Sequence, residues 1–287
     1  MANRPLIGVD LGGTNIRAGR VESHLIVNLA ARPTPAQAEA GVVVADLIRT
    51  IEEVLSPEVS GIGIGVPSVV DVEQGIVYDV ENIPSWREVP LKRILEERFK
   101  VPVHVNNDAN CFALGEYHFG KGRGAKSLVG LIVGTGLGAG LVLNGRLYSG
   151  VNCGAGEIGS LPYHGHTYEY YVSGPRFQRD HGRDGGQLYE AALRGEGEAL
   201  GIFEAFGRDL GKTIALAIYA YDPDRILLGG SVSRAYPFFR EAVWSELQTF
   251  AFQQSLKRLS IEVSEEPQIA ILGAAALCLD VSAGISI

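Results

Sequence analysis

Residues 6–21 read LIGVDLGGTNIRAGRV, and residues 128–148 read LVGLIVGTGLGAGLVLNGRLY. Each stretch places a glycine-rich turn, at residues 10–14 or 134–138, between two apolar segments with the pattern of strands. Glycine lets backbone N–H groups close around phosphate oxygens where a Cβ would obstruct them. Two such turns in matching contexts indicate a duplicated nucleotide-binding fold.

The segments after the two turns also match. The first turn leads into an alternating run up to Val21, with a third strand predicted at residues 24–29. The second leads into residues 139–143, and Asn144-Gly145 predicts a tight hairpin turn into residues 146–148. Each half is therefore predicted to open with a three-strand meander bent around a glycine turn.

Helical and strand patterns alternate after each meander, which is typical of an α/β layer. In the first half, helices are predicted at 38–55 and 91–99 and strands at 61–66 and 103–105. In the second half, helices are predicted at 198–221, 237–250 and 269–279 and a strand at 225–228. Residues 151–197 interrupt this order as a long insertion in which we predict no core element.

The length of 287 residues fits two domains at ~150 residues each. We place the boundary near residues 115–124, where glycines and basic residues interrupt the apolar pattern. The predicted domains are a small N-terminal α/β domain, residues 1–118 plus 274–287, and a larger C-terminal α/β domain, residues 119–273.

Composition excludes several classes of protein. A net charge of −8 argues against broad contact with nucleic acid or an anionic membrane. The longest uncharged apolar run, 128–143, is broken by glycines, and residues 1–5 precede the first strand without an apolar signal core. The three cysteines, Cys111, Cys153 and Cys278, have no metal-type spacing. We expect a cytoplasmic protein that contacts neither nucleic acid nor membrane.

Polar residues with catalytic potential come directly after the predicted strand 103–105, in the sequence Asn106-Asn107-Asp108-Ala109-Asn110. Ligands of α/β sheets gather at the carboxyl ends of strands, so a site is expected here. A carboxylate flanked by amides can accept a proton from a hydroxyl while the amides hold neighbouring hydroxyls. The same residues can instead cap the helix after them, and the segment by itself slightly favours that interpretation.

Taken together, the motifs resemble those of the ROK family of sugar kinases, within the actin, Hsp70 and hexokinase superfamily. The resemblance runs nearly end to end. The matching segments are 10–17 for a first phosphate motif, 65–71 for a sugar-side loop, 82–91 for the segment after it, 107–110 for the catalytic aspartate, 134–145 for a second phosphate loop, 155–159 for a sugar motif, and 222–231 for an adenosine motif.

This resemblance implies a duplicated ribonuclease-H-like, two-domain α/β fold with an interdomain cleft that binds ATP. It implies an ATP-dependent sugar kinase in which Asp108 is the general base, Asp10 holds Mg²⁺ through water, and the partner is a small-molecule sugar. The implied phosphate-binding residues are Gly12, Gly13, Thr14, Thr135 and Gly136, and the implied adenosine-binding residues are Gly229, Gly230 and Ser231. The implied sugar-binding residues are Asn107, Glu157, Ser160, Glu169 and Ser68.

The chain departs from the family pattern at three places. Ser160 stands where the family normally has a sugar-binding His after its Glu-x-Gly motif, and Ser68 stands where the family usually has Gly. No cysteine lies between Gly159 and Ser173, so we expect no structural zinc. His164 and His166 could be substitute metal ligands, but a His-x-His pair without a nearby thiolate is more typical of a polar loop. We expect Tyr163, Tyr168 and neighbouring aromatic residues to pack this loop instead of a metal.

The substrate stays open at this stage. Glucose or a related aldohexose, phosphorylated on its terminal hydroxyl, is the first hypothesis; fructose, allose and an N-acetylhexosamine are alternatives, as is a sugar-binding regulator without kinase activity. Family repressors carry a helix-turn-helix extension, for which there is no room before the strand at Leu6. A chaperone-type ATPase fits poorly with Asn107, Glu157 and Glu169. The family also implies a homodimer or homotetramer.

Overall fold

The computed structural model describes residues 4–283, with the side chains of 280–283 excepted. The chain divides into two compact units. Unit 1 comprises residues 1–123, 146–155 and 266–287, and unit 2 comprises residues 124–145 and 156–265. The outer ends of the first predicted domain, residues 1–3 and 284–287, lie outside the described residues. Unlike the predicted division, the observed one assigns residues 146–155 to unit 1 and begins its last segment at Glu266.

Unit 1 is built on a five-stranded sheet with the order β3-β2-β1-β4-β8. β1 pairs with β2 in antiparallel register and with β4 in parallel register, and β4 pairs with β8 in parallel. The sheet strands are β1 (Leu6–Leu11), β2 (Asn15–Glu22), β3 (Leu25–Pro33), β4 (Ile62–Val66) and β8 (Val103–Asn107). A smaller antiparallel sheet contains β5 (Val69–Asp71), β6 (Ile76–Tyr78) and β7 (Glu88–Val89). The short strand β11 (Arg146–Leu147), which comes after the Asn144-Gly145 turn, is not part of that smaller sheet.

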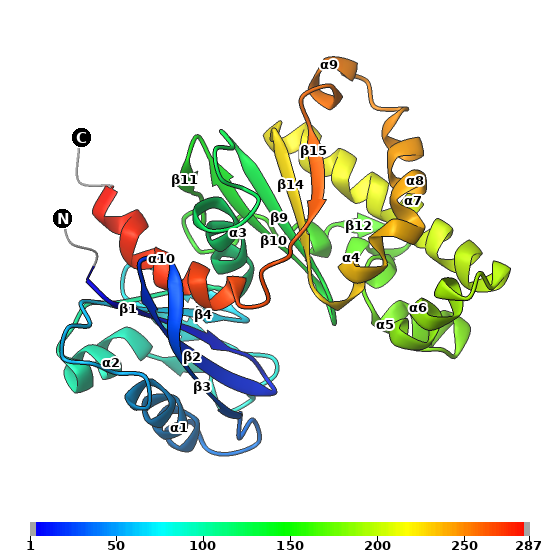
Figure 1. Cartoon of the computed structure of the whole chain (residues 1–287). Helices are drawn as coiled ribbons and strands as arrows, with labels where there is room; N and C mark the ends of the chain where they lie inside the picture. The colour runs from blue at the N-terminus through cyan, green and yellow to red at the C-terminus, as the bar shows by residue number, and fades with distance from the viewer. Residues whose placement is uncertain (1–3, 284–287) are drawn as a thin grey trace. The chain divides into compact units, whose positions relative to one another are not determined.

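Helices cover both faces of this sheet (Figure 1). α1 (Ala40–Glu52) and α2 (Leu91–Phe99) pack on one face, and α3 (Asp108–His118) and α10 (Ile269–Ala283) pack on the other. Apolar residues spaced at the helical period explain α1, which buries Val43, Leu47 and Ile51 against the strands. α10 lies so close to the sheet that a Cβ on Gly63 would overlap the carbonyl oxygen of Ala274.

Unit 2 repeats the strand order, with β10-β9-β14-β15 consecutive in its sheet. β9 pairs with β10 in antiparallel register and with β14 in parallel register, and β14 pairs with β15 in parallel. The strands are β9 (Leu128–Val133), β10 (Leu137–Leu143), β14 (Arg225–Gly229) and β15 (Ser260–Val263). The predicted duplication is therefore confirmed by the topology, although the short strand β15 was not predicted.

The helices of unit 2 are α4 (Tyr168–Tyr171), α5 (Pro175–His181), α6 (Gly185–Leu193), α7 (Gly197–Tyr221), α8 (Tyr236–Leu247) and α9 (Gln253–Leu256). The 3₁₀ helices η1 (Ile158–Ser160) and η2 (Ser231–Ala235) and the hairpin of β12 (Pro162–Tyr163) and β13 (His166–Thr167) complete it. The prediction that residues 151–197 hold no core element is wrong, because α5 buries Phe177 and α6 buries Leu188 completely. Each helix contributes too few apolar residues to show a clear periodicity. No helix among residues 4–283 is long and apolar enough to span a membrane.

Candidate active site

The first glycine turn closes between β1 and β2 in unit 1. The amide of Gly12 donates to the carbonyl oxygen of Asn15 (2.9 Å), and the Thr34 hydroxyl donates to the carbonyl oxygen of Gly12 (2.7 Å). A Cβ on Gly13 would lie 2.6 Å from the Cβ of Asn82, so the turn depends on glycine there. Residues of unit 1 therefore fix the turn, through hydrogen bonds with Asn15 and Thr34 and through close packing against Asn82.

Asp10 stands at the end of β1, directly before this turn. Its carboxylate lies 2.8 Å from the guanidinium of Arg17, the residue opposite it on β2. Burial raises the pKa of Asp10 above its ordinary value, and the charge and hydrogen bond of Arg17 offset part of that rise. The arrangement keeps one partly shielded carboxylate beside the glycine turn.

The polar residues at the end of β8 have different tasks. Asn107 is the N-cap of α3, because its Oδ1 accepts from the amide of Ala109 (2.8 Å), and its Nδ2 donates to the carbonyl oxygen of Ser68 (3.3 Å). Asp108 is the first residue of α3, and its Oδ1 accepts from the same amide (2.9 Å). A carboxylate is favourable at a helix N-terminus. The capping interpretation is thus right for Asn107, and the half-buried carboxylate of Asp108 accepts from the same helix amide.

The buried side chain of Asn106 holds this segment in place through hydrogen bonds, a role that was not predicted from the sequence. Its buried Oδ1 accepts from the amide of Asn107 (2.8 Å), from Asn110 Nδ2 (2.9 Å) and from the Cys153 thiol (3.2 Å). Its Nδ2 donates to the Ser149 hydroxyl (3.1 Å). Ser149 and Cys153 lie more than 40 positions along the chain. The run of asparagines was the only available signal.

Ser68 contributes backbone rather than side chain to this arrangement. Its hydroxyl donates to the carbonyl oxygen of Tyr78, on the neighbouring strand β6. Its own carbonyl oxygen accepts from Asn107. The Ser68 hydroxyl can therefore still accept a hydrogen bond from a sugar, but it could donate one only by releasing Tyr78.

In unit 2, the second glycine turn is held by residues from the insertion. The carbonyl oxygen of Gly134 accepts from the amide of Gly174 (2.7 Å), and the Leu137 amide donates to Glu169 Oε2 (2.8 Å). A Cβ on Gly136 would lie 2.5 Å from the same carboxylate oxygen. Glu169, a predicted sugar-binding residue, therefore also anchors the predicted phosphate loop.

Glu157 and Ser160 lie at the two ends of η1, which contacts both β10 and α4. Gly156 precedes them with a φ of +95°, where a Cβ would overlap the carbonyl oxygen of Ala139. Partial burial of the Glu157 carboxyl group and repulsion from Glu169 raise its pKa. The structure thus brings the two predicted sugar-binding glutamates near each other, with the exposed Ser160 on the same short helix.

The loop between η1 and α5 is packed by aromatic rings. Tyr163 stacks on Tyr168 with ring centroids 4.4 Å apart, and His166 stacks on Tyr170 at 3.8 Å. The predicted aromatic packing of this loop is confirmed. His166 is engaged in a ring stack, and the described residues 4–283 contain no group of three or more potential metal ligands.

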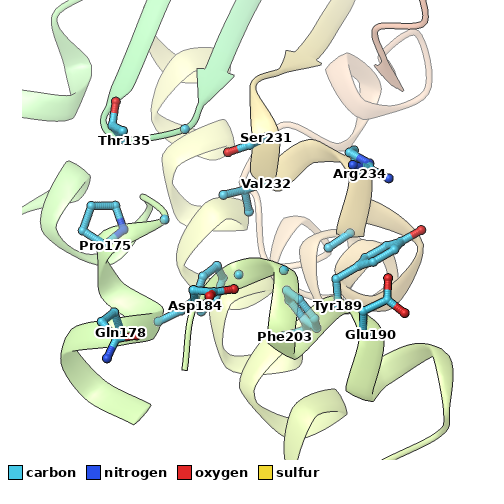
Figure 2. A pocket seen from close by; sticks show the side chains of 16 residues that line it. Thr135, Pro175, Gln178, Asp184, Tyr189, Glu190, Phe203, Ser231, Val232 and Arg234 are labelled. Carbon is cyan, nitrogen blue, oxygen red and sulfur yellow. The ribbon is translucent and has the colours of Figure 1, made fainter. Parts of the chain in front are cut away.

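A cavity of ≈ 600 Å³ opens in unit 2 beside the second glycine turn (Figure 2). Thr135 and Ser231, which come after the ends of β9 and β14, border it, and Tyr189 and Glu190 enter from α6. Its remaining walls include Pro175, Phe177, Gln178, Asp184, Phe203, Val232 and Arg234. Sequence reasoning found Thr135 and Ser231 and missed the α5 and α6 residues, because no motif marks them.

Gly229 and Gly230 lead from β14 to this cavity without lining it. Gly230 has a φ of +84°, and a Cβ there would overlap the carbonyl oxygen of Val133. Glycine is therefore required for the turn that presents Ser231 to the cavity.

The repeated strand order and the two glycine turns define a duplicated α/β fold of the actin and hexokinase type. The chain belongs to the ROK family, whose family model matches residues 6–281. It is 32% identical to a glucokinase of Halalkalibacterium halodurans, over 88% of this chain and 87% of that protein. It is also 32% identical to an N-acetyl-D-glucosamine kinase of Vibrio cholerae, over 79% and 84%. The crystal structure of a ROK family glucokinase from Streptomyces griseus, in complex with glucose and AMPPNP, superposes with a TM-score of 0.80 and 27% identity, covering 95% of this chain and 98% of that one.

Proposed function

We propose that this protein transfers the γ-phosphoryl group of ATP to the terminal hydroxyl of a hexose, with Asp108 as the general base. The chain is an ATP-dependent sugar kinase of the ROK family. Glucose or a related aldohexose is the proposed substrate. The observation that carries the proposal is the carboxylate of Asp108 on the first turn of α3, beside the Asn107 side chain that caps this helix.

Asp108 would accept the proton of the terminal hydroxyl as its oxygen forms a bond to the γ-phosphorus. The bond between that phosphorus and the bridging oxygen breaks, and ADP leaves. Phosphoryl transfer needs little covalent assistance from the protein, so positioning and charge neutralisation supply most of the acceleration. Asn107, Glu157 and Glu169 would hold the sugar hydroxyls. Ser68 would shape the sugar side through its loop.

The nucleotide would be bound by two kinds of group. Backbone donors of Gly13, Thr14, Thr135 and Gly136 would hold its phosphates, while Gly12, whose amide donates to Asn15, would shape the first turn. The cavity of unit 2, with Ser231 at its border and aromatic walls from Phe177 and Tyr189, would take the adenosine, as ligand pockets combine apolar walls with a few polar groups. Gly229 and Gly230 would act through the turn that positions Ser231.

Asp10 would hold Mg²⁺ through water. A single carboxylate suits Mg²⁺, which usually keeps several of its waters and takes its other ligands from substrate phosphates. Burial raises the pKa of Asp10, and Arg17 offsets only part of that rise, so a cation beside this carboxylate would further favour its charged form. When bound, the ion would neutralise charge on the phosphates.

An N-acetylhexosamine is the second candidate substrate. Ser160 is short, and it is exposed at the end of η1 where a larger family residue would fill space. The identity to an N-acetyl-D-glucosamine kinase, 32%, equals that to a glucokinase, although it extends over 79% of this chain rather than 88%. A sugar with an acetamido group could use that room.

Product analysis tests the proposal. The protein is incubated with Mg²⁺-ATP and each of glucose, mannose, fructose and N-acetylglucosamine, and the products are identified by phosphorus and proton NMR. We expect one aldohexose to give a phosphomonoester on its terminal carbon. A phosphate on the anomeric carbon, or hydrolysis of ATP without a sugar phosphate, would contradict the proposed reaction.

A further inference from the structure

The segment that carries Glu169 cannot hold its shape by itself. α4 comprises only four residues, Tyr168–Tyr171, and contains no buried residue. Such a short helix gains little from its own hydrogen bonds. Its position must therefore be set by neighbouring side chains.

Two arginines of α5 hold the last carbonyl groups of α4. Arg176 Nη1 donates to the carbonyl oxygen of Tyr171 (2.8 Å), and Arg179 Nη1 donates to that of Tyr170 (2.9 Å). The Arg179 guanidinium also lies 3.4 Å from the centre of the Tyr170 ring. Arginine side chains thus satisfy carbonyl groups that a helix end leaves without partners.

Asp209 of α7 fixes the more buried of these arginines. Its Oδ2 lies 2.6 Å from Arg176 Nη1, and its Oδ1 accepts from the Tyr163 hydroxyl at 2.8 Å. The side chains of Asp209 and Arg176 are only 16% and 12% exposed. Burial and the hydrogen bond to Asp209 raise the pKa of Tyr163, so the tyrosine stays protonated and remains a donor.

Tyr163, which Asp209 holds, also contacts α4 through its ring. Its ring stacks on Tyr168, the neighbour of Glu169, and meets Tyr171 edge to face with centroids 5.3 Å apart. The Glu169 carboxylate in turn accepts the Leu137 amide at the second glycine turn. A continuous set of contacts therefore runs from α7 through α4 to that turn.

We infer that Tyr163 and Asp209 are positioning residues, which act through Arg176 and α4 to hold the Glu169 carboxylate for its sugar and for the second glycine turn. This inference rests on the proposed function where it concerns the sugar. Its structural part concerns the hydrogen bond from the Leu137 amide to Glu169, which can be followed in the protein without an activity assay.

The test uses Tyr163→Phe, which removes one hydroxyl and keeps the ring stack, and Asp209→Asn. We expect Tyr163→Phe to weaken sugar binding about 10-fold in calorimetry, the size expected for losing a hydrogen bond to a charged group. The KM for the sugar should rise with it, while kcat stays within about twofold because Tyr163 touches no reacting atom. Hydrogen exchange at the Leu137 amide should accelerate about 10-fold.

Glu204→Gln is the matched control. It removes an ion pair with Arg208 on the same helix as Asp209, and both of its partners are largely exposed. Exposed pairs of this kind contribute little. Sugar affinity and Leu137 exchange should therefore stay at the wild-type values.

The double variant Tyr163→Phe/Glu169→Ala distinguishes positioning from general loosening. If Tyr163 acts through Glu169, the double variant should bind sugar no more weakly than Glu169→Ala alone. Additive losses, or a folded Tyr163→Phe with wild-type sugar affinity and Leu137 exchange, would overturn the inference. If the wild type binds no hexose, the proposed function fails, and Leu137 exchange in Tyr163→Phe still decides whether Tyr163 positions Glu169.

Discussion

The two sheets share one scaffold and differ in the residues at the carboxyl ends of their strands. β2-β1-β4-β8 in unit 1 and β10-β9-β14-β15 in unit 2 have the same order and the same directions of pairing. In unit 1, β8 leads into Asn107 and Asp108 at the start of α3. In unit 2, the strand at that place, β15, is followed by residues 264–268 and then by α10, whereas the second parallel strand, β14, leads into Gly230 and Ser231 beside a cavity.

The two copies of the fold therefore have the same backbone turns but different functional side chains. The glycine turns are the shared part, because phosphate groups can be held by backbone donors in either copy. The side chains at the later strand ends are the specialised part. We propose that one copy supplies the proton acceptor and the other the nucleoside pocket.

The largest expected effect comes from removing the carboxylate of unit 1. Asp108→Asn should lower kcat at least ~100-fold, the low end for loss of a positioned general base, with sugar and nucleotide affinities nearly unchanged. Steady-state kinetics and calorimetry measure these quantities. Asp46→Asn, which neutralises an ion-paired carboxylate on α1 of the same unit, should retain wild-type kcat. A near-normal rate in Asp108→Asn would remove the proposed base.

The corresponding change in unit 2 should affect ATP instead. Gly230→Ala forces a Cβ onto a residue with a φ of +84° and against the Val133 carbonyl. We expect the KM for ATP to rise about 10-fold or more, since misplacing a binding group by about 1 Å carries such costs, and the Tm to fall. The sugar affinity should change far less.

Gly201→Ala is the control for that glycine. Gly201 lies in α7, and apart from its chain neighbours and the nearby backbone of its own helix, no described atom lies within 4 Å of the position of a Cβ. Its KM for ATP should stay unchanged, and its Tm should rise slightly because alanine favours a helix. An equal loss of ATP affinity in both glycine variants would contradict the role of the Gly230 turn.

A smaller, pH-dependent effect is expected at Glu157. Its pKa in the folded protein is raised above 4.5, so folding stability contributed by the protonated form is present below that value and is lost as the pH rises through the raised pKa. Glu157→Gln should remove this loss. The variant should therefore have the higher Tm at neutral pH while binding sugar about 10-fold more weakly, as expected for losing a charged acceptor.

Thermal unfolding of both proteins across the acidic range checks this prediction. The Tm difference should be smallest below the ordinary pKa and grow as the pH rises. A Tm difference that stays constant with pH, or a wild-type sugar affinity in Glu157→Gln, would show that Glu157 is a loop carboxylate without the proposed role.

The smallest effect is expected at Ser160. Ser160→His restores the residue that the family pattern has at this position. We expect the ratio of kcat/KM values between sugars to shift by about 10-fold, within the range for one altered pocket contact. An unchanged preference across the sugars would mean that position 160 does not set specificity.

The sequence predicted the meanders, the parallel strands and the long helices, because glycine turns and apolar periodicity are local signals. It missed β15, where Ile261 alone is buried among half-buried neighbours, and it missed α5 and α6, whose core contacts come from a few residues such as Phe177. The candidate site residues were predicted from short sequence motifs. The hydrogen bonds that hold those residues in place were not predicted. The bond between Leu137 and Glu169 spans 32 positions, and the Cys153 thiol reaches Asn106 across 47. No local pattern records such partners.

The central claim is tested most directly by a coupled ADP-release assay with Mg²⁺-ATP across hexoses, ketohexoses and N-acetylhexosamines, run in parallel on Asp108→Asn. We predict rapid turnover of one aldohexose by the wild type and its loss in the variant. If no sugar in the panel gives ADP release while calorimetry still shows sugar binding, the protein is a sugar-binding regulator or acts on another polyol, and the account of Asp108 as the base for hexose phosphorylation is wrong.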